Sequence, residues 1–142
     1  MEIELRTASR DDVALFDEVA VDVFDRPIAP VLLWEFLSDP RHHIVVAIED
    51  SARIVGFASA IHYVHPDKPP ELWINEVGVS PDHHRRGLGS RLIRELLGLG
   101  RQLGCAEAWV LTERSNQPAM RLYESAGGEE ADEETVMFSF RL

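Results

Sequence analysis

Cysteine is almost absent from the chain, because Cys105 is the only thiol among 142 residues. A single thiol cannot form an internal disulfide, and it offers no cysteine-rich metal site. Cys105 stands between Gly104 and Ala106 with no obvious base beside it, which favours a buried structural thiol over a nucleophile. The sequence therefore predicts neither disulfide stabilisation nor thiol chemistry.

Long hydrophobic runs are absent as well. No stretch approaches the roughly 20 apolar residues that span a bilayer, and Met1 is followed by Glu2 and Glu4 instead of a basic and then apolar leader. The chain also lacks internal repeats, low-complexity segments and long linkers. With 142 residues and an apolar fraction of 45%, we expect one globular domain over residues 1–142, soluble and cytoplasmic, with no membrane partner.

Basic residues are scarce, since 14 Lys and Arg face 25 Asp and Glu, for a formal net charge of -11. Such a chain repels nucleic acid, so we expect no nucleic-acid partner, and cationic small molecules or peptides are its more natural partners. Five of the 14 basic residues nevertheless fall between Arg85 and Arg101. This local concentration indicates an anionic ligand of limited size.

Hydrophobic periodicity predicts an order of strand, two helices, three strands, helix, strand, helix and strand. A capping box at residues 9–12 predicts the start of the first helix, and Pro40 follows the end of the second. The expected strands are residues 3–7, 42–50, 53–64, 71–80, 106–112 and 135–140, and the expected helices are residues 9–23, 31–39, 88–103 and 116–128. The passage from Leu72 to Leu111 is a crossover unit, so its two strands should be parallel in an α/β or α+β layered domain.

The stretch HHRRGLGSRLI, residues 83–93, joins the local positive charge to a glycine-rich turn. Backbone amides at the start of a helix lack intrahelical partners, and the helix dipole places partial positive charge there. Gly87 and Gly89 carry no side chain to keep an anion away from these amides, while Arg85 and Arg86 add full charges. The whole pattern favours a phosphate ligand. The two glycines taken alone favour the alternative, in which they only make the start of the helix easier to form and the arginines are solvated.

Two common phosphate-binding patterns do not fit, because the chain has neither a third glycine after Gly89 nor a Gly-Lys-Ser/Thr sequence. The stretch resembles the signature of the GNAT acetyltransferase superfamily, Arg/Gln-x-x-Gly-x-Gly/Ala between a strand and a helix. His84 stands where the first Arg or Gln is usual. A second block, NQPAMRLYESAGG, is similar to the superfamily's Asn-x-x-Ala-x-x-Leu-Tyr-x-x-x-Gly segment and matches it at Asn116, Ala119, Leu122, Tyr123 and Gly127.

The resemblance implies a mixed, mostly antiparallel central sheet with one parallel, splayed strand pair and helices on both faces. It implies acetyl-CoA as cosubstrate, with no metal, lying between the strand that ends near Val79 and the strand that begins at Glu107. The pantetheine arm would pair with the backbone of Val77 and Val79, and the pyrophosphate would rest on the amides of residues 85–90. The implied cofactor-binding residues are Val77, Gly78, Val79, His84, Arg85, Arg86, Gly87, Leu88, Gly89, Ser90, Asn116, Ala119 and Tyr123.

Direct acetyl transfer to an amine needs a neutral nucleophile and a proton for the departing thiolate. Glu76 is the candidate general base, because strand parity places it on the same face as Leu72 and Ile74, where we expect it to be buried. Asn75 and Glu76 side by side could equally mark a bulge or a solvated edge. Tyr123 is the second candidate catalytic residue, since the matching tyrosine of the superfamily protonates the leaving thiolate.

The acceptor amine is less constrained by the sequence. The chain is similar to the small aminoglycoside 3-N-acetyltransferase branch in its proline-containing loop, in ELWINEVGVSPDHHRRGLGSRLI and in its acidic segment before TVMFSF, with Glu76 at that branch's Asp position. The resemblance therefore suggests an aminoglycoside acceptor, a role in antibiotic resistance and a homodimer. The alternatives are a polyamine, a small amine metabolite or a protein amine, and, from another class, a non-catalytic acyl-CoA-binding module.

Metal binding is the weaker interpretation of the remaining polar residues. His62, His65 and Asp67 fall in or beside a proline-rich loop without a helical ligand frame, which favours solvated loop residues over metal ligands. Trp34, Trp73 and Trp109 are expected in the core or lining a cleft, because the negative charge of the chain disfavours a stacking platform for nucleic acid.

Overall fold

A computed structural model describes residues 2–131 and 133–142. Its centre is a sheet with the strand order β1-β2-β3-β4-β5. The strands are β1 (Ile3–Thr7), β2 (His42–Glu49), β3 (Arg53–Tyr63), β4 (Glu71–Val79) and β5 (Glu107–Val110). The first four pair antiparallel in sequence, and β4 pairs with β5 in parallel. The expected mixed sheet with one parallel pair is therefore confirmed.

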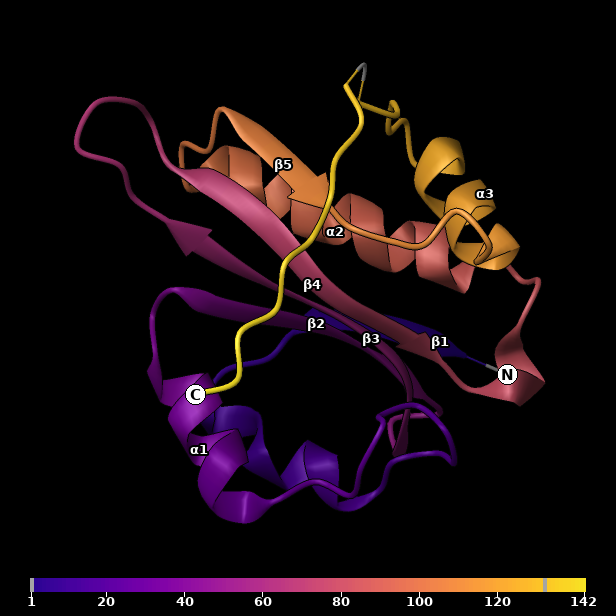
Figure 1. The fold of residues 1–142 in the computed structure, drawn as a ribbon. Helices are drawn as coiled ribbons and strands as arrows, with labels where there is room; N and C mark the ends of the chain where they lie inside the picture. The colour runs from indigo at the N-terminus through magenta and orange to yellow at the C-terminus, as the bar shows by residue number, and fades with distance from the viewer. Residues whose placement is uncertain (1, 132) are drawn as a thin grey trace.

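Helices cover both faces of this sheet (Figure 1). The α-helix α2 (Leu88–Gln102) packs on one face, against β2, β3 and β4. The 3-10 helix η1 (Arg10–Asp17) and the α-helix α1 (Pro30–Ser38) lie on the other, and α3 (Gln117–Ser125) packs against α2. Fully buried side chains fill the space between the sheet and its helices, the largest of them being Ile48, Ile54, Leu72, Leu92 and Leu96.

The hairpin between β2 and β3 turns without glycine. Asp50 and Ser51 both adopt positive φ, at 52° and 59°. This pair of left-handed residues is the geometry of the tight hairpin turn that the spacing of the two strands predicts. The predicted hairpin is therefore confirmed.

The first predicted helix is shorter than expected. The capping box is present, because the side chain of Ser9 accepts from the backbone while that of Asp12 accepts from the Ser9 amide. The helix nevertheless ends at Asp17 and has 3-10 geometry. The prediction of helix through Val23 was wrong, because the backbone at residues 18–20 bonds to β3 instead: the Ile54 amide donates to the Glu18 carbonyl, and Ala20 donates to Ile54.

The predicted last strand was also wrong. Residues 133–142 form no helix or strand, although TVMFSF has the alternation and residue types of one. A strand requires a neighbouring strand to pair with its backbone, and this segment runs across the molecule without one (Figure 1). Sequence propensity cannot supply that partner.

Candidate functional site

The turn before α2 presents free backbone amides. A short 3-10 helix, η2 (Pro81–His83), follows β4. The α-helix α2 then begins at Leu88, and no side chain caps its start. Gly87 stands at the cap position with φ 73°, a conformation that L side chains rarely adopt. The amide of Arg91 is the first to bond back, to the Gly87 carbonyl. The amides of residues 88–90 therefore remain available to an anion at the positive end of the helix dipole.

The two glycines of the turn are required for different structural reasons. A Cβ on Gly87 would meet nothing within 4 Å, so this residue is required for its backbone conformation. A Cβ on Gly89 would lie 3.1 Å from Cδ1 of Leu122, so this glycine allows α3 to pack closely on α2. The interpretation that both glycines clear space for the anion is therefore corrected for Gly89.

Arg85 and Arg86 are exposed at the same turn. Arg85 has φ 63°, which is uncommon for a residue with a side chain and places strain in the turn. Among residues 2–131 and 133–142, no ion pair or side-chain hydrogen bond involves either guanidinium group, so both can approach a ligand from this turn.

His84 is exposed, and its Nε2 lies 2.8 Å from the carbonyl oxygen of Val79. The ring therefore acts as a local brace between the turn and the end of β4. A phosphate contact through Nε2 would require the brace to open, whereas Nδ1 is not engaged in it.

His83 anchors the turn to the sheet, and sequence reasoning missed it. The His83 side chain is only 5% exposed, and its Nε2 bonds to Oε2 of Glu49 at the end of β2. Glu49 also lies near Arg53, with 3.7 Å between the guanidinium and the carboxylate. The Nδ1 atom of His83 is buried without a partner. The only sequence signal was a second histidine beside His84 in the motif.

Strands β4 and β5 separate where the predicted cosubstrate would enter. Their register runs from Glu71 opposite Glu107 to Ile74 opposite Val110. Beyond that point β5 has ended, whereas β4 continues to Val79. The backbone of residues 75–79 therefore has β3 on one side and no strand on the other. This matches the predicted splayed pair and leaves Val77, Gly78 and Val79 at the open edge.

A β-bulge corrects the predicted orientation of Glu76. Ser59 pairs with Glu76 but Ala60 pairs with Ile74, so Asn75 is an extra residue in β4. Leu72 contacts α2, because a Cβ on Gly100 would lie 3.0 Å from its Cδ2. The bulge reverses the alternation, so Glu76 lies on the opposite face from Leu72 and Ile74.

Glu76 is exposed, so the prediction that it would be buried was also wrong. Gly78, two residues later on the same face, lies against the Val23 carbonyl and the Phe57 ring. Glu76 therefore faces the side of the sheet that carries η1, α1 and the loop at residues 18–29. Its carboxylate is open to an incoming solute on that side.

Tyr123 lies half-buried on α3, and burial raises the pKa of its phenol above the ordinary value. Asn116 caps the same helix, since its Oδ1 accepts from the Ala119 amide at 3.1 Å. The predicted block therefore forms one helix, with a structural role for Asn116 and for the Ala119 amide. Ser90 of the turn reaches this helix through a 2.7 Å contact with the hydroxyl of Ser125.

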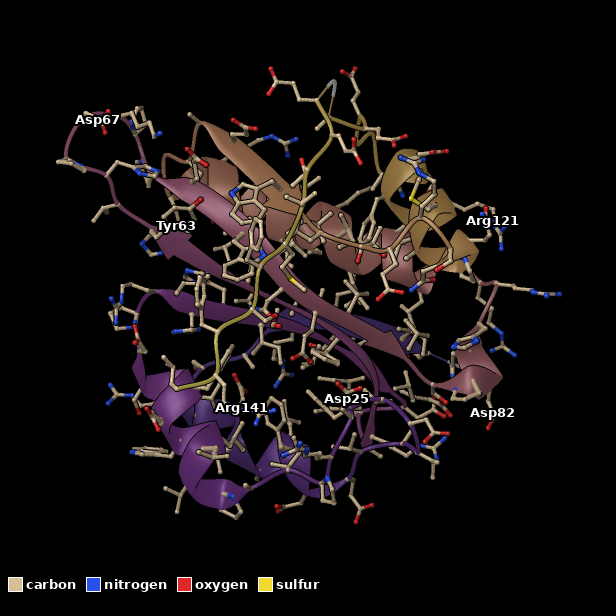
Figure 2. The ribbon with its side chains drawn as sticks, in the orientation of Figure 1. Asp25, Tyr63, Asp67, Asp82, Arg121 and Arg141 are labelled. Carbon is tan, nitrogen blue, oxygen red and sulfur yellow. The ribbon has the colours of Figure 1, made fainter. Side chains whose placement is uncertain are left out.

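The loop at residues 18–29 crosses the end of β4 on the Glu76 side. Val23 covers Gly78, and the Phe24 ring stacks on Phe57 with 4.0 Å between centroids. A cavity of about 300 Å³ opens along this loop, and it is lined in part by Asp22, Asp25 and Arg26. Figure 2 shows Asp25 on this side of the sheet. The loop therefore places carboxylates near the face that carries Glu76.

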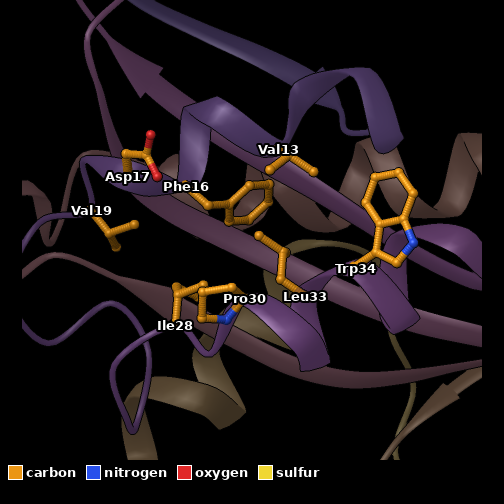
Figure 3. A pocket seen from close by; sticks show the side chains of 8 residues that line it. All are labelled: Val13, Phe16, Asp17, Val19, Ile28, Pro30, Leu33 and Trp34. Atoms are coloured by element: carbon orange, nitrogen blue, oxygen red, sulfur yellow. The ribbon is translucent and has the colours of Figure 1, made fainter.

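A second cavity, of about 400 Å³, lies between η1 and α1 (Figure 3). Phe16 and Leu33 line this cavity from the two helices, and Val19 and Ile28 line both cavities. Among the residues that line the cavity between η1 and α1, only Asp17 carries a carboxylate. None of the predicted site residues borders either cavity. The two cavities are therefore features of the η1 and α1 side that sequence reasoning did not identify.

The histidines proposed as weak metal candidates have other partners. Nε2 of His43 lies 2.8 Å from Nδ1 of His62, and burial together with His62 lowers the pKa of His43 to about 4. His65 lies 3.2 Å from the carboxylate of Glu71. Within residues 2–131 and 133–142 there is no group of three or more potential ligands placed to hold a metal ion.

Trp73 and Trp109 stack on each other across β4 and β5, with 5.1 Å between ring centroids. The indole of Trp109 donates to the Tyr63 hydroxyl at 2.9 Å. Both tryptophans are half-buried and serve the packing of the parallel pair, whereas Trp34 is 53% exposed on α1. Trp34 nevertheless lines the cavity between η1 and α1, so the expectation of a core or cleft-lining position fits all three tryptophans.

Comparison with known proteins assigns this arrangement to a family. The model of the Acetyltransferase (GNAT) family matches residues 10–128. The chain is 32% identical over 127 residues to N-alpha-acetyltransferase RimI of Mycobacterium tuberculosis, a match that covers 88% of this chain and 77% of that protein. The chain belongs to the GNAT acetyltransferase family.

Two solved structures share the fold. An aminoglycoside acetyltransferase, meta-AAC0020, from an uncultured soil metagenomic sample in complex with sisomicin superposes with a TM-score of 0.80 at 20% identity, covering 99% of this chain and 96% of that one. AAC(6')-Iy in complex with the bisubstrate analogue CoA-S-monomethyl-acetylneamine also gives 0.80, at 21% identity over the whole of both chains. The predicted enzyme class is confirmed by the family, and the predicted cosubstrate agrees with the CoA group of that analogue.

Proposed function

We propose that this protein is an acetyl-CoA-dependent N-acetyltransferase that transfers the acetyl group directly to a primary amine of a small cationic acceptor. The observation that carries the proposal is the uncapped start of α2, where Gly87 adopts positive φ beside two free arginines. This turn lies at the end of β4, where β5 has already ended. In a member of the GNAT family, that arrangement suits the pyrophosphate and pantetheine of acetyl-CoA.

The turn provides what a pyrophosphate needs. Free amides at residues 88–90 and the exposed guanidinium groups of Arg85 and Arg86 can share its negative charge. The open edge of residues 77–79 can pair with the amides of the pantetheine arm. The carbonyl oxygen of Val79 already contacts the ring of His84. Pairing of the pantetheine arm with Val79 therefore relies on the second lone pair of this oxygen or on the Val79 amide.

Glu76 is the proposed general base, acting directly or through water. It stands exposed on the face that bears the loop at residues 18–29, so an acceptor bound there can meet it without crossing the sheet. Asp22 and Asp25 add negative charge along that loop. These three carboxylates, in a chain of net charge -11, favour a cationic amine.

Tyr123 is the proposed general acid for the departing thiolate. Its raised pKa keeps the phenol protonated at neutral pH, so a proton is available to donate. Its helix contacts the turn through Ser90 and Ser125, which supports a role on the donor side of the site. Glu76 lies on β4 and Tyr123 on α3, so the proposed base and acid come from different elements.

Among cationic amines, an aminoglycoside is the first candidate acceptor. The narrower sequence resemblance concerns 3-N-acetyltransferases, and the solved neighbours include a sisomicin complex and an enzyme named AAC(6')-Iy. The position of acetylation is therefore part of the test. The 32% identity to a RimI protein makes an amino-terminal peptide the second candidate.

A panel of acceptors with acetyl-CoA tests the proposal through the release of free thiol. The panel holds an aminoglycoside set, a polyamine, a small diamine and a peptide with a free N-terminus. We expect turnover with at least one amine, and mass spectrometry of the product then identifies the acetylated nitrogen. Binding of acetyl-CoA without turnover on any amine would support the non-catalytic module instead, and no binding of acetyl-CoA would refute the proposal.

A further inference from the structure

The turn at residues 84–90 is shaped by its own backbone but is not fixed on the sheet by it. The His84 amide donates to the Pro81 carbonyl, and the Gly87 carbonyl accepts from the first turn of α2. Both bonds join neighbours along the connection between β4 and α2, and Gly87 and the three residues before it are exposed. Leu88, 4% exposed, seats the start of α2 through apolar contacts, which have no preferred direction. The position of the turn on the sheet therefore depends on side-chain contacts at its other end.

His83 is the side chain that ties this end of the turn to distant strands. The side chain is 5% exposed, and its Nε2 donates to Oε2 of Glu49, because an ionised carboxylate can only accept. The carboxylate lies in turn beside Arg53, its partner in the β2–β3 register, with 3.7 Å between the charged groups. One row of three side chains therefore connects β3, β2 and the turn. The contact from His84 to Val79, in contrast, stays within the connection between β4 and α2.

The burial of the His83 ring is costly for stability. Its Nδ1 atom is buried and has no hydrogen-bond partner among residues 2–131 and 133–142. A buried polar atom without a partner destabilises the folded state, and an apolar ring of similar size would avoid that cost. The chain nevertheless has a histidine directly before the exposed turn. Fold stability alone therefore does not account for this side chain, whereas a directional contact at the turn does.

We propose that His83 and Glu49 form a positioning pair that sets the affinity of the turn for the pyrophosphate of the donor. The inference rests on the proposed function. The free amides at residues 88–90 bind an anion together only while they point to the same place, so a small displacement of the turn weakens several contacts at once. His83 and Glu49 lie on η2 and β2, whereas the proposed base and acid lie on β4 and α3. We therefore expect the pair to govern the KM for acetyl-CoA and to leave kcat unchanged.

The sign of the effect separates positioning from simple electrostatics. If Glu49 acted at the turn only through its charge, Glu49→Leu would favour the binding of an anion. Positioning predicts the opposite: Glu49→Leu and His83→Phe should each raise the Kd of CoA about tenfold in isothermal titration calorimetry. Because the two residues act as one unit, the double variant should bind CoA about as weakly as either single variant. An unchanged or lower Kd in both single variants would overturn the proposal.

Asp82→Asn is the matched control, because this exposed carboxylate lies on η2 beside His83 (Figure 2). The substitution removes a charge at the turn but leaves the pair intact, so we expect a Kd for CoA equal to or below that of the unchanged protein. His83→Gln should recover most of the affinity, since the amide nitrogen of Gln can donate in place of Nε2. A His83→Gln protein that binds CoA no better than His83→Phe would contradict the role of this donor.

S-acetyl-pantetheine, a donor without the pyrophosphate, distinguishes the turn from the whole fold. We expect Glu49→Leu and His83→Phe to lower kcat/KM with acetyl-CoA about tenfold through KM and to leave kcat/KM with S-acetyl-pantetheine unchanged. An equal loss with both donors would mean that the pair only supports the fold, and Glu49→Leu decides alone if His83→Phe does not fold. An unchanged protein that does not bind CoA would refute the proposed function together with this inference. Equal binding of CoA by the unchanged protein and the variants would refute this inference alone.

Discussion

The turn at residues 84–90 and the loop at residues 18–29 both lie at the end of β4, but they are constrained in different ways. In the turn, Gly87 is required for its positive φ and Gly89 for the approach of α3. The loop is attached to β3 by the backbone of residues 18–20 and, beyond them, through Val23 and Phe24, whereas its other side chains are exposed or line cavities. The difference fits the proposal that the turn receives a fixed ligand part, the donor pyrophosphate, and that the loop receives a variable acceptor.

Glu76→Gln should have the largest effect, because this substitution removes the proposed base from the acceptor side. We expect kcat to fall by about 1,000-fold, within the range for general-base catalysis. Steady-state kinetics with saturating acetyl-CoA measures this. Glu107→Gln, an exposed carboxylate at the start of β5, is the control and should stay within about three-fold of the unchanged protein. Near-normal turnover of a folded Glu76→Gln protein would remove Glu76 from the mechanism.

Gly78→Ala should separate the loop from β4. A Cβ at this position would overlap the Val23 carbonyl and lie 2.8 Å from the Phe57 ring. Because the backbone must move, we expect a loss of about 3 kcal/mol in the free energy of unfolding, measured with urea. Gly98→Ala, where a Cβ meets nothing within 4 Å, should instead stabilise the helix by roughly 0.5–1 kcal/mol. Equal stabilities of the two variants would show that the loop is not held at Gly78.

Tyr123→Phe should slow the chemical step by about 100-fold in single-turnover measurements if the phenol is the acid. The raised pKa of the folded state also predicts a pH effect on stability. The native protein favours the protonated phenol, so this contribution is complete below the unfolded pKa of about 10 and is lost as pH rises through the folded pKa. Urea unfolding at increasing alkaline pH should show this loss in the unchanged protein and less of it in Tyr123→Phe. An unchanged chemical step would exclude the acid role.

His84→Arg should have the smallest effect. The substitution restores the usual basic residue of the motif but removes the 2.8 Å contact with the Val79 carbonyl. We expect the KM for acetyl-CoA to change by less than about three-fold, because a gained phosphate contact and a lost brace oppose each other. A decrease of tenfold or more in the KM for acetyl-CoA would show that the contact between His84 and Val79 contributes little to binding and that the unchanged turn lacks a cation.

The sequence predicted the turn before α2 and the start of α3 better than the orientation of Glu76, for physical reasons. Positive φ at Gly87 and the capping Asn116 act locally, so a short motif contains the information. The orientation of Glu76 depends on how β4 pairs with β3, because one extra residue, Asn75, reverses the alternation. The anchor between His83 and Glu49 joins residues far apart in the chain, and the second histidine of the motif does not indicate which residue it contacts.

The ends of the predicted elements illustrate the same limit. The helix predicted through Val23 stops at Asp17, because β3 offers backbone partners to residues 18–20. The segment predicted as a strand at 135–140 pairs with no strand in the part of the chain that the structure describes. Both errors concern long-range pairing, which alternation and propensity do not encode. Among residues 2–131 and 133–142, none of the helices combines the length and the apolar composition that a membrane span requires.

The role of the turn as the pyrophosphate site is tested most directly by comparing two donors, acetyl-CoA and S-acetyl-pantetheine, which lacks the pyrophosphate. We predict that the unchanged protein prefers acetyl-CoA in kcat/KM by at least about 100-fold, and that Arg85→Ala with Arg86→Ala reduces this preference tenfold or more while S-acetyl-pantetheine is used equally well. A protein that uses both donors equally, or a double variant that retains the full preference, would contradict the account.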